Sequence, residues 1–219
     1  MITRDSLHNT EPSALFGELT NRKYLTEKQL MESLEKFLAA KPVSEPVWIF
    51  AYGSLIWNPV VNFSERQTGY LSGHERAFCM KLTIGRGSNS RPGRMLGLVP
   101  GKGTHGVLLK IEEKNLLEEL KLLWKREMSA NSYLPIWAAV ELSDGRTVNA
   151  LTFVMSDEHE SYDAVHEPSY VANFILRACG PLGTNLEYLE KLHSALIDNN
   201  IVDQYITNVA SEVRQKNGK

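Results

Sequence analysis

The sequence is short of cysteine, of long apolar runs and of an excess of either charge, and each shortage excludes a class of protein. Only two cysteines, Cys79 and Cys179, occur among 219 residues, too few for a disulfide framework and too far apart for a metal knuckle. No apolar stretch reaches the roughly 18 residues of a membrane span. The 24 Lys and Arg nearly balance the 26 Asp and Glu. We therefore expect neither nucleic acid nor a membrane as partner.

The amino-terminal residues are polar and lack the apolar segment of a secretory signal peptide. This feature, with the low cysteine content, predicts a cytoplasmic protein. A chain of this length suits one domain with a sizeable core and an added arm. We expect an arm with one helix over residues 1–43 and a single main domain over 44–215.

Hydrophobic patterning predicts short strands in the middle of the chain and helices on both sides of them. Thr26 and Gln29 form a capping box that starts a helix over 26–40 in the arm, and Thr184 and Glu187 cap a helix in the last third. Asp144-Gly145 marks the turn of a hairpin. The predicted strands are 47–51, 67–71, 76–82, 95–99, 107–111, 136–142 and 147–155, and further helices cover 114–128 and most of the last third. Because the strands do not alternate regularly with helices, we predict an α+β fold with a mostly antiparallel or mixed, barrel-like sheet rather than a doubly wound fold.

Glu127 is the first candidate for chemistry. At about 100° per residue, it points within about 20° of Leu116 and Leu120, on the apolar face of its helix. Buried carboxylates are rare and are usually paired or functional. Burial would raise the pKa of this carboxyl and make it a better general base. The alternative is that the helix frays and that Glu127 reaches water from the last turn.

A Gly-Ser turn in the most apolar segment, IFAYGSLIWN, is the second candidate. Consecutive N–H groups in the turn Tyr52–Leu55 can form a concavity for a carboxylate or an oxyanion. Gly53 would let a ligand approach the backbone, and Ser54 adds a hydroxyl group. The alternative is a purely structural turn at a strand end.

The segment from Gly85 to Arg94 is the third candidate, because it places three arginines among glycines, serines and a proline. It predicts a loop that holds an anion, although a solvated flexible loop is the alternative. It lacks the Lys-Ser/Thr ending of a phosphate-binding loop. The acidic segments near His159 and His166 do not have the spacing of a zinc helix, so we expect no metal site.

Four motifs in the expected order give the chain a family resemblance. They are Val47 to Pro59, Pro92 to Arg94, Arg126-Glu127, and Asn185 to Leu189. Together they resemble the ChaC-type, glutathione-specific γ-glutamylcyclotransferases. The resemblance covers residues 47 to 190 and leaves the arm outside. The family often has a His where this chain has Gly85.

The resemblance implies a γ-glutamylcyclotransferase-like barrel with flanking helices in residues 44–215, and an enzyme without a cofactor. We also expect a monomer. The implied reaction cleaves glutathione to 5-oxoproline and cysteinylglycine. Glu127 corresponds to the catalytic glutamate of the family, and the turn after the first strand would hold the γ-glutamyl end of the substrate. The expected substrate-binding residues are Tyr52, Gly53, Ser54, Leu55, Ile56, Trp57, Arg86, Arg94 and Tyr133.

Two other functions fit parts of the sequence. Ser54 would be the nucleophile of an amidohydrolase if His74 or His105 served as its base, although no G-x-S-x-G elbow surrounds it. The turn and the arginine loop would also suit a non-catalytic sensor of small anions. A sensor has no need for a carboxylate on a buried helix face.

Overall fold

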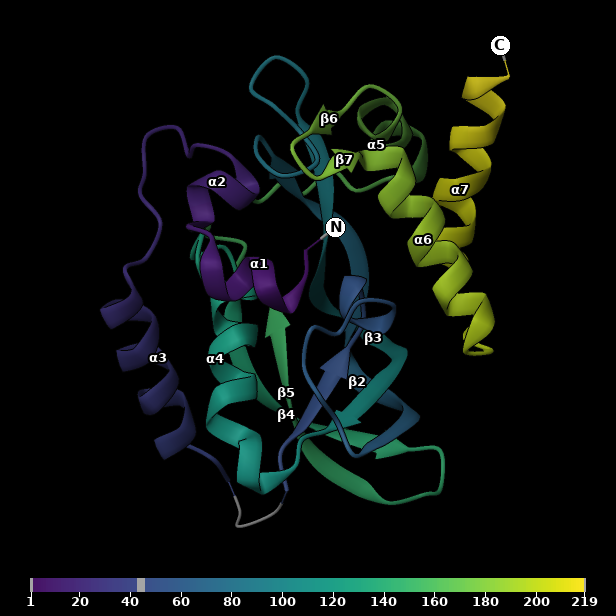
Figure 1. Ribbon diagram of the computed structural model, residues 1–219. Helices are drawn as coiled ribbons and strands as arrows, with labels where there is room; N and C mark the ends of the chain where they lie inside the picture. Colours follow the sequence, from purple (N-terminus) through teal and green to yellow (C-terminus); the bar gives the residue numbers. More distant parts are fainter. Residues whose placement is uncertain (1, 43–45, 219) are drawn as a thin grey trace.

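The computed structural model describes residues 2–42 and 46–218, and a closed barrel forms the centre of the described chain (Figure 1). The strand order is β1-β3-β2-β4-β5. β1 pairs antiparallel with β3 and parallel with β5, which closes the barrel and makes it mixed. The predicted α+β class with a mixed barrel is thus confirmed. The barrel strands are β1 (Trp48–Ala51), β2 (Glu65–Leu82), β3 (Gly93–Lys110), β4 (Leu134–Leu142) and β5 (Thr147–Val154).

Two long strands replace the four short ones predicted between residues 67 and 111. β2 and β3 pair from Glu65 with Lys110 to Leu82 with Gly93. The register shifts between Ser72 and His74 and again between Ala77 and Met80. Such bulges bend a strand without ending it. The polar residues at the first bulge interrupt the apolar pattern, and this interruption made each strand look like two.

The described part of the arm, residues 2–42, contains three helices and not the single helix predicted. α1 (Arg4–Asn9) and α2 (Pro12–Phe16) precede the predicted helix, which is α3 (Glu27–Ala39). The two extra helices have six and five residues, too few for a hydrophobic period to show. The Thr26–Gln29 capping box of α3 is confirmed. The predicted boundary between 43 and 44 lies outside the described residues.

The helices after the barrel pack together on one side of it (Figure 1). Thr184 caps α6 by accepting a hydrogen bond from the N–H of Glu187, as predicted. No helix in the described ranges is long and apolar enough to cross a bilayer. The remaining elements are α4 (Leu116–Glu127), α5 (Pro168–Ile175), α6 (Asn185–Asp198), α7 (Gln204–Asn217), the 3-10 turns η1 (Ser54–Ile56) and η2 (Glu113–Asn115), and the short strands β6 (Cys179–Gly180) and β7 (Gly183–Thr184).

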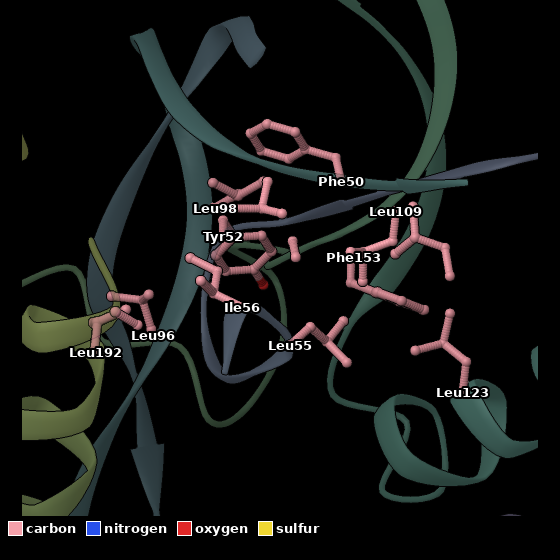
Figure 2. Close-up of a cluster of buried hydrophobic side chains, with 14 of the residues drawn as sticks. Phe50, Tyr52, Leu55, Ile56, Leu96, Leu98, Leu109, Leu123, Phe153 and Leu192 are labelled. Carbon is pink, nitrogen blue, oxygen red and sulfur yellow. The ribbon is translucent and has the colours of Figure 1, made fainter. Parts of the chain in front are cut away.

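The hydrophobic core fills the barrel and includes the turn that follows β1. In Figure 2, Tyr52, Leu55 and Ile56 lie within the same cluster as barrel side chains such as Leu98 and Phe153. The turn therefore rests on a rigid, close-packed base. The apolar residues on both sides of the Gly-Ser pair are packed in the core and hold this otherwise flexible pair in place.

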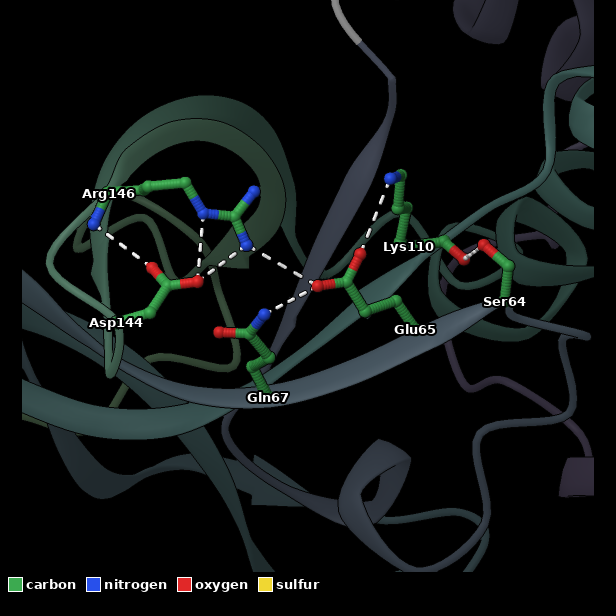
Figure 3. A network of polar contacts seen from close by, with 6 residues as sticks. All are labelled: Ser64, Glu65, Gln67, Lys110, Asp144 and Arg146. Atoms are coloured by element: carbon green, nitrogen blue, oxygen red, sulfur yellow. Dashed lines mark hydrogen bonds and ion pairs between the residues drawn. The ribbon is translucent and has the colours of Figure 1, made fainter.

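A polar network covers the opposite, β4–β5 end of the barrel (Figure 3). Glu65 accepts hydrogen bonds from Gln67 and Lys110 and forms an ion pair with Arg146. Arg146 is also paired with Asp144. Exposed pairs of this kind contribute about 0–1 kcal/mol each, so Arg146 serves below as a control position.

Candidate active site

The turn after β1 provides the backbone of the site. The N–H groups of Ile56 and Asn58 are bonded within the turn, to the carbonyls of Gly53 and Ser54. The N–H groups of residues 53–55 are therefore the candidates for binding a ligand. A Cβ atom on Gly53 would lie 3.1 Å from the hydroxyl of Tyr188, so a larger residue there would force this hydroxyl to shift by a few tenths of an ångström.

A cavity of about 190 Å³ opens beside this turn. Eight of the ten predicted site residues line it, drawn from the turn, the end of α4, the arginine loop and the start of β4. Their roles as catalytic or substrate-binding groups stay predictions. The eight are Tyr52, Gly53, Ser54, Leu55, Trp57, Arg86, Glu127 and Tyr133.

Ile56 and Arg94, the other two predicted site residues, do not line the cavity. Ile56 is buried in the hydrophobic core. Arg94 is only 1% exposed, pairs with Asp163, and stacks with its guanidinium carbon 4.1 Å from the centre of the Phe174 ring. The structure therefore corrects the expectation of direct substrate contact for both residues. The reason is that each side chain points away from the cavity and into packing with residues distant in sequence.

Glu127 is the last residue of α4 and lines the cavity. Its side chain is 16% exposed, and its Oε1 lies 3.0 Å from Nε of Arg126. Burial raises the pKa of this carboxyl, and the charge and hydrogen bond of Arg126 oppose that rise. Each sequence-based alternative is thus partly right: Glu127 lies in the last helical turn, and it is also largely withdrawn from water.

Arg126 connects the end of α4 to the turn. It is 4% exposed, and its NH2 group donates to Oγ of Ser54 at 2.8 Å while NH1 donates to the carbonyl of Asn58. The sequence motif contained Arg126, but no role was predicted for it. Its direct adjacency to Glu127 was the only available signal.

Three tyrosines surround the carboxylate of Glu127. Burial raises the pKa values of Tyr52, Tyr133 and Tyr188, so all three are neutral phenols at physiological pH. The hydroxyl of Tyr133 donates to the carbonyl of Leu96 at 2.8 Å. Tyr188 was not predicted as a site residue, although it belongs to one of the four motifs.

Arg86 reaches the cavity with much of its charge already compensated. Its NH1 group donates to the carbonyl of Thr184 at 2.7 Å and to Oε2 of Glu187 at 2.9 Å. Lys191 donates to the other oxygen of Glu187 at 2.6 Å. Hydrogen bonds from Lys191 and Arg86 lower the pKa of Glu187 to about 2, so it is a fixed anion.

The geometry disfavours a serine hydrolase. Ser54 accepts a hydrogen bond from Arg126, and an arginine cannot act as a general base at neutral pH. His74 pairs with Pro100 between β2 and β3, and His105 with Tyr70; neither histidine lines the cavity. Among the described residues, no group of three His, Cys, Asp or Glu side chains is placed to hold a metal ion.

A comparison with protein families shows to which family this chain belongs. The model of the ChaC-like proteins matches residues 47–216, which is most of the chain. The chain belongs to the ChaC-like family. Like the predicted main domain, the matched region begins just before β1, and it extends into α7.

Two relatives resemble this chain over much of their length. The glutathione-specific γ-glutamylcyclotransferase of Escherichia coli is 44% identical over 215 residues, covering 98% of this chain and 93% of the relative. The glutathione-specific γ-glutamylcyclotransferase 1 of Mus musculus is 31% identical over 68% of both chains. The arm thus lies outside the family model but within the match to the bacterial relative.

The ChaC-like fold is also found in a crystal structure from yeast, described as a γ-glutamyl cyclotransferase specific to glutathione. It superimposes with a TM-score of 0.72 at 23% identity, covering 78% of this chain and 97% of the yeast chain. At that identity the likeness supports the fold alone. It agrees with the predicted γ-glutamylcyclotransferase-like barrel with flanking helices.

Proposed function

We propose that this ChaC-like protein cleaves glutathione to 5-oxoproline and cysteinylglycine by an intramolecular attack. The observation that carries the proposal is the buried carboxylate of Glu127, which lies in one cavity with the Tyr52–Leu55 turn. The names of the bacterial and mouse relatives support glutathione as the substrate.

The α-amine of the γ-glutamyl group would attack its own side-chain amide carbonyl and close a five-membered ring. The amine arrives as an ammonium ion and must first lose a proton. With pKa values of roughly 8 for the α-amine and 4.3 for Glu, transfer to Glu127 is uphill by about 5 kcal/mol in water. Burial raises the pKa of Glu127 and disfavours the charged ammonium, so both effects reduce this cost.

The remaining steps use the same side chains. N–H groups of residues 53–55 would stabilise either the oxyanion or the substrate α-carboxylate. Protonated Glu127 would return its proton to the leaving amine of cysteinylglycine. Holding the γ-glutamyl chain curled against Trp57 would supply the proximity that ring closure needs.

The reaction moves a proton and exchanges one C–N bond for another, with no change in oxidation state. We therefore expect no cofactor. A monomeric state and a cytoplasmic location stay predictions from the sequence.

The products test the proposal. Purified protein is incubated with glutathione in ¹⁸O-labelled water, and the products are identified by mass. Unlabelled 5-oxoproline with cysteinylglycine supports the cyclisation, because no solvent oxygen enters the ring. Free glutamate carrying ¹⁸O as the main product would contradict the cyclisation and show that the protein is a hydrolase. N-acetyl-glutathione should be inert while still competing for binding, since it has no free amine.

A further inference from the structure

The amino-terminal arm forms part of the cavity wall. Ile2, Phe16 and Arg22 all line the cavity, although they come from the segment that the family model does not match. In Figure 1 the arm, drawn in purple, runs along the same side of the barrel as α4. The arm is therefore not an independent appendage.

Several anchors fix the arm to both sides of the cavity. Arg4 forms a two-pronged ion pair with Glu119 of α4, one prong of which is 3.1 Å long. The carbonyl of Phe16 accepts a hydrogen bond from the N–H of Gly85 in the arginine loop. The N–H of Leu25 donates to the carbonyl of Ser129, just beyond Glu127, at 2.9 Å. The arm thus bridges the arginine loop and the end of α4.

Cationic side chains outnumber carboxylates in the cavity wall. Among the described residues that line it, five are cationic and one, Glu127, is a carboxylate, and glutathione carries two carboxylates. Contacts described above already occupy three of the cations: Arg126 with Glu127, and Arg86 and Lys191 with Glu187. The five cations are Arg22, Lys81, Arg86, Arg126 and Lys191.

Arg22 is the better placed of the two remaining cations. The carbonyl of Ala130 at 2.7 Å and Oγ of Ser132 at 3.2 Å hold its guanidinium from the loop after Glu127. NH1 also lies 3.1 Å from Nε2 of His159, so Nε and the second hydrogen of NH2 are the donors that a carboxylate can use. Its Nε lies 3.1 Å from the carboxylate of Glu160, a side chain that is 62% exposed. A pair this exposed is weak in water, so another carboxylate can replace Glu160. Lys81, in contrast, is an exposed residue of β2 with no carboxylate partner within the described ranges.

We propose that Arg22 binds the glycine carboxylate of glutathione and that the arm thereby selects substrates that end in this carboxylate. The inference rests on the proposed function, since it takes the γ-glutamyl end to lie at the turn beside Glu127. The planar guanidinium matches a carboxylate through two parallel N–H bonds, which lysine cannot provide. Glu160 occupies one of these donors and would be displaced by the substrate.

The test compares glutathione with its glycine ethyl ester, which retains the γ-glutamyl end and loses the carboxylate. Steady-state kinetics are measured for wild type, Arg22→Ala, Arg22→Lys, Lys81→Ala and the control Arg146→Ala. Wild type should favour glutathione over the ester by about tenfold or more in kcat/KM, because the ester cannot accept hydrogen bonds as a charged carboxylate does. Arg22→Ala should raise KM for glutathione by that factor, change kcat less, and leave KM for the ester nearly unaltered.

Arg22→Lys should retain only part of the wild-type preference for glutathione over the ester. Lys81→Ala and Arg146→Ala should retain the full preference. If Arg22 had a purely structural role, Arg22→Ala would raise KM equally for glutathione and for the ester. That result would overturn the inference. A preference lost in Lys81→Ala but retained in Arg22→Ala would also overturn it. A wild-type protein that forms no 5-oxoproline from glutathione would overturn the proposed function and this inference together.

Discussion

Oε1 of Glu127 lies 3.0 Å from Nε of Arg126, its immediate neighbour in the chain. The same guanidinium donates to Oγ of Ser54, so one buried arginine links the acid to the turn. Burial and this arginine act on the pKa of Glu127 in opposite directions, and burial dominates. Because the two effects oppose each other, the carboxylate of Glu127 can be ionised at neutral pH and still accept a proton readily.

Glu127→Gln should retain the fold and lose nearly all turnover. The amide is almost isosteric but cannot accept the proton, and a general base contributes about 10²–10⁴-fold. Glutathione should still bind, because the turn remains intact. The measurements are kcat and the dissociation constant, with Glu118→Gln as control, since Glu118 is a 68% exposed residue of the same helix. A variant with more than about a tenth of the wild-type kcat would exclude the general-base role.

Arg126→Met should move the acidic limb of the kcat/KM profile to higher pH. The base must be ionised, so activity falls as pH drops through the pKa of Glu127. Removing the positive charge removes what opposes the effect of burial, and that pKa rises further. Arg126→Lys retains the charge and should shift the limb less. An unchanged limb in the methionine variant would show that another group controls it.

Ser54→Ala should reduce kcat/KM by less than about tenfold. The change removes one side-chain hydrogen bond, which is worth about 1 kcal/mol, and leaves the backbone N–H groups in place. Loss of a serine nucleophile costs on the order of 10⁶-fold in a serine protease. Turnover of Ser54→Ala therefore separates the cyclotransferase from the hydrolase, and an inactive but folded variant would favour the hydrolase.

Arg94→Ala should destabilise the protein without raising KM in the folded enzyme. Arg94 is buried with the carboxylate of Asp163 and the ring of Phe174, and breaking such a pair costs about 3 kcal/mol. Urea unfolding and steady-state kinetics are measured on the same preparation. Arg94→Lys should not restore stability, since an ammonium group cannot stack as a guanidinium does. If Arg94→Ala raised KM and left the stability unchanged, Arg94 would contact the substrate after all.

Arg4→Ala should loosen the arm and raise KM for glutathione. The change breaks the ion pair with Glu119 that anchors α1, although Asn62 still donates two hydrogen bonds to Glu119. We expect faster hydrogen exchange in residues 2–25, with a change in kcat much smaller than the change in KM. Arg146→Ala, at the opposite end of the barrel, should alter neither. Unchanged exchange in the arm would mean that its other anchors suffice.

Local sequence signals determined several parts of this protein. Helical spacing alone identified Glu127, and the Gly-Ser pair identified the turn, because residue spacing fixes which face of an element a side chain occupies. The capping residues Thr26 and Thr184 marked helix starts through hydrogen bonds within four residues. Strand clustering without helix alternation predicted the α+β class and a barrel-like sheet, mostly antiparallel or mixed.

Only the tertiary structure decided which of these residues meet. Arg86 and Arg94 belong to the same arginine-rich segment, yet Arg86 reaches the cavity and Arg94 is buried against α5. Nothing within the segment separates them, because their partners, Glu187 and Asp163, are about 100 and 69 residues away. The arm likewise joins the cavity wall through contacts with α4 and the arginine loop. Contacts between distant segments depend on how the whole chain packs, which no local period encodes.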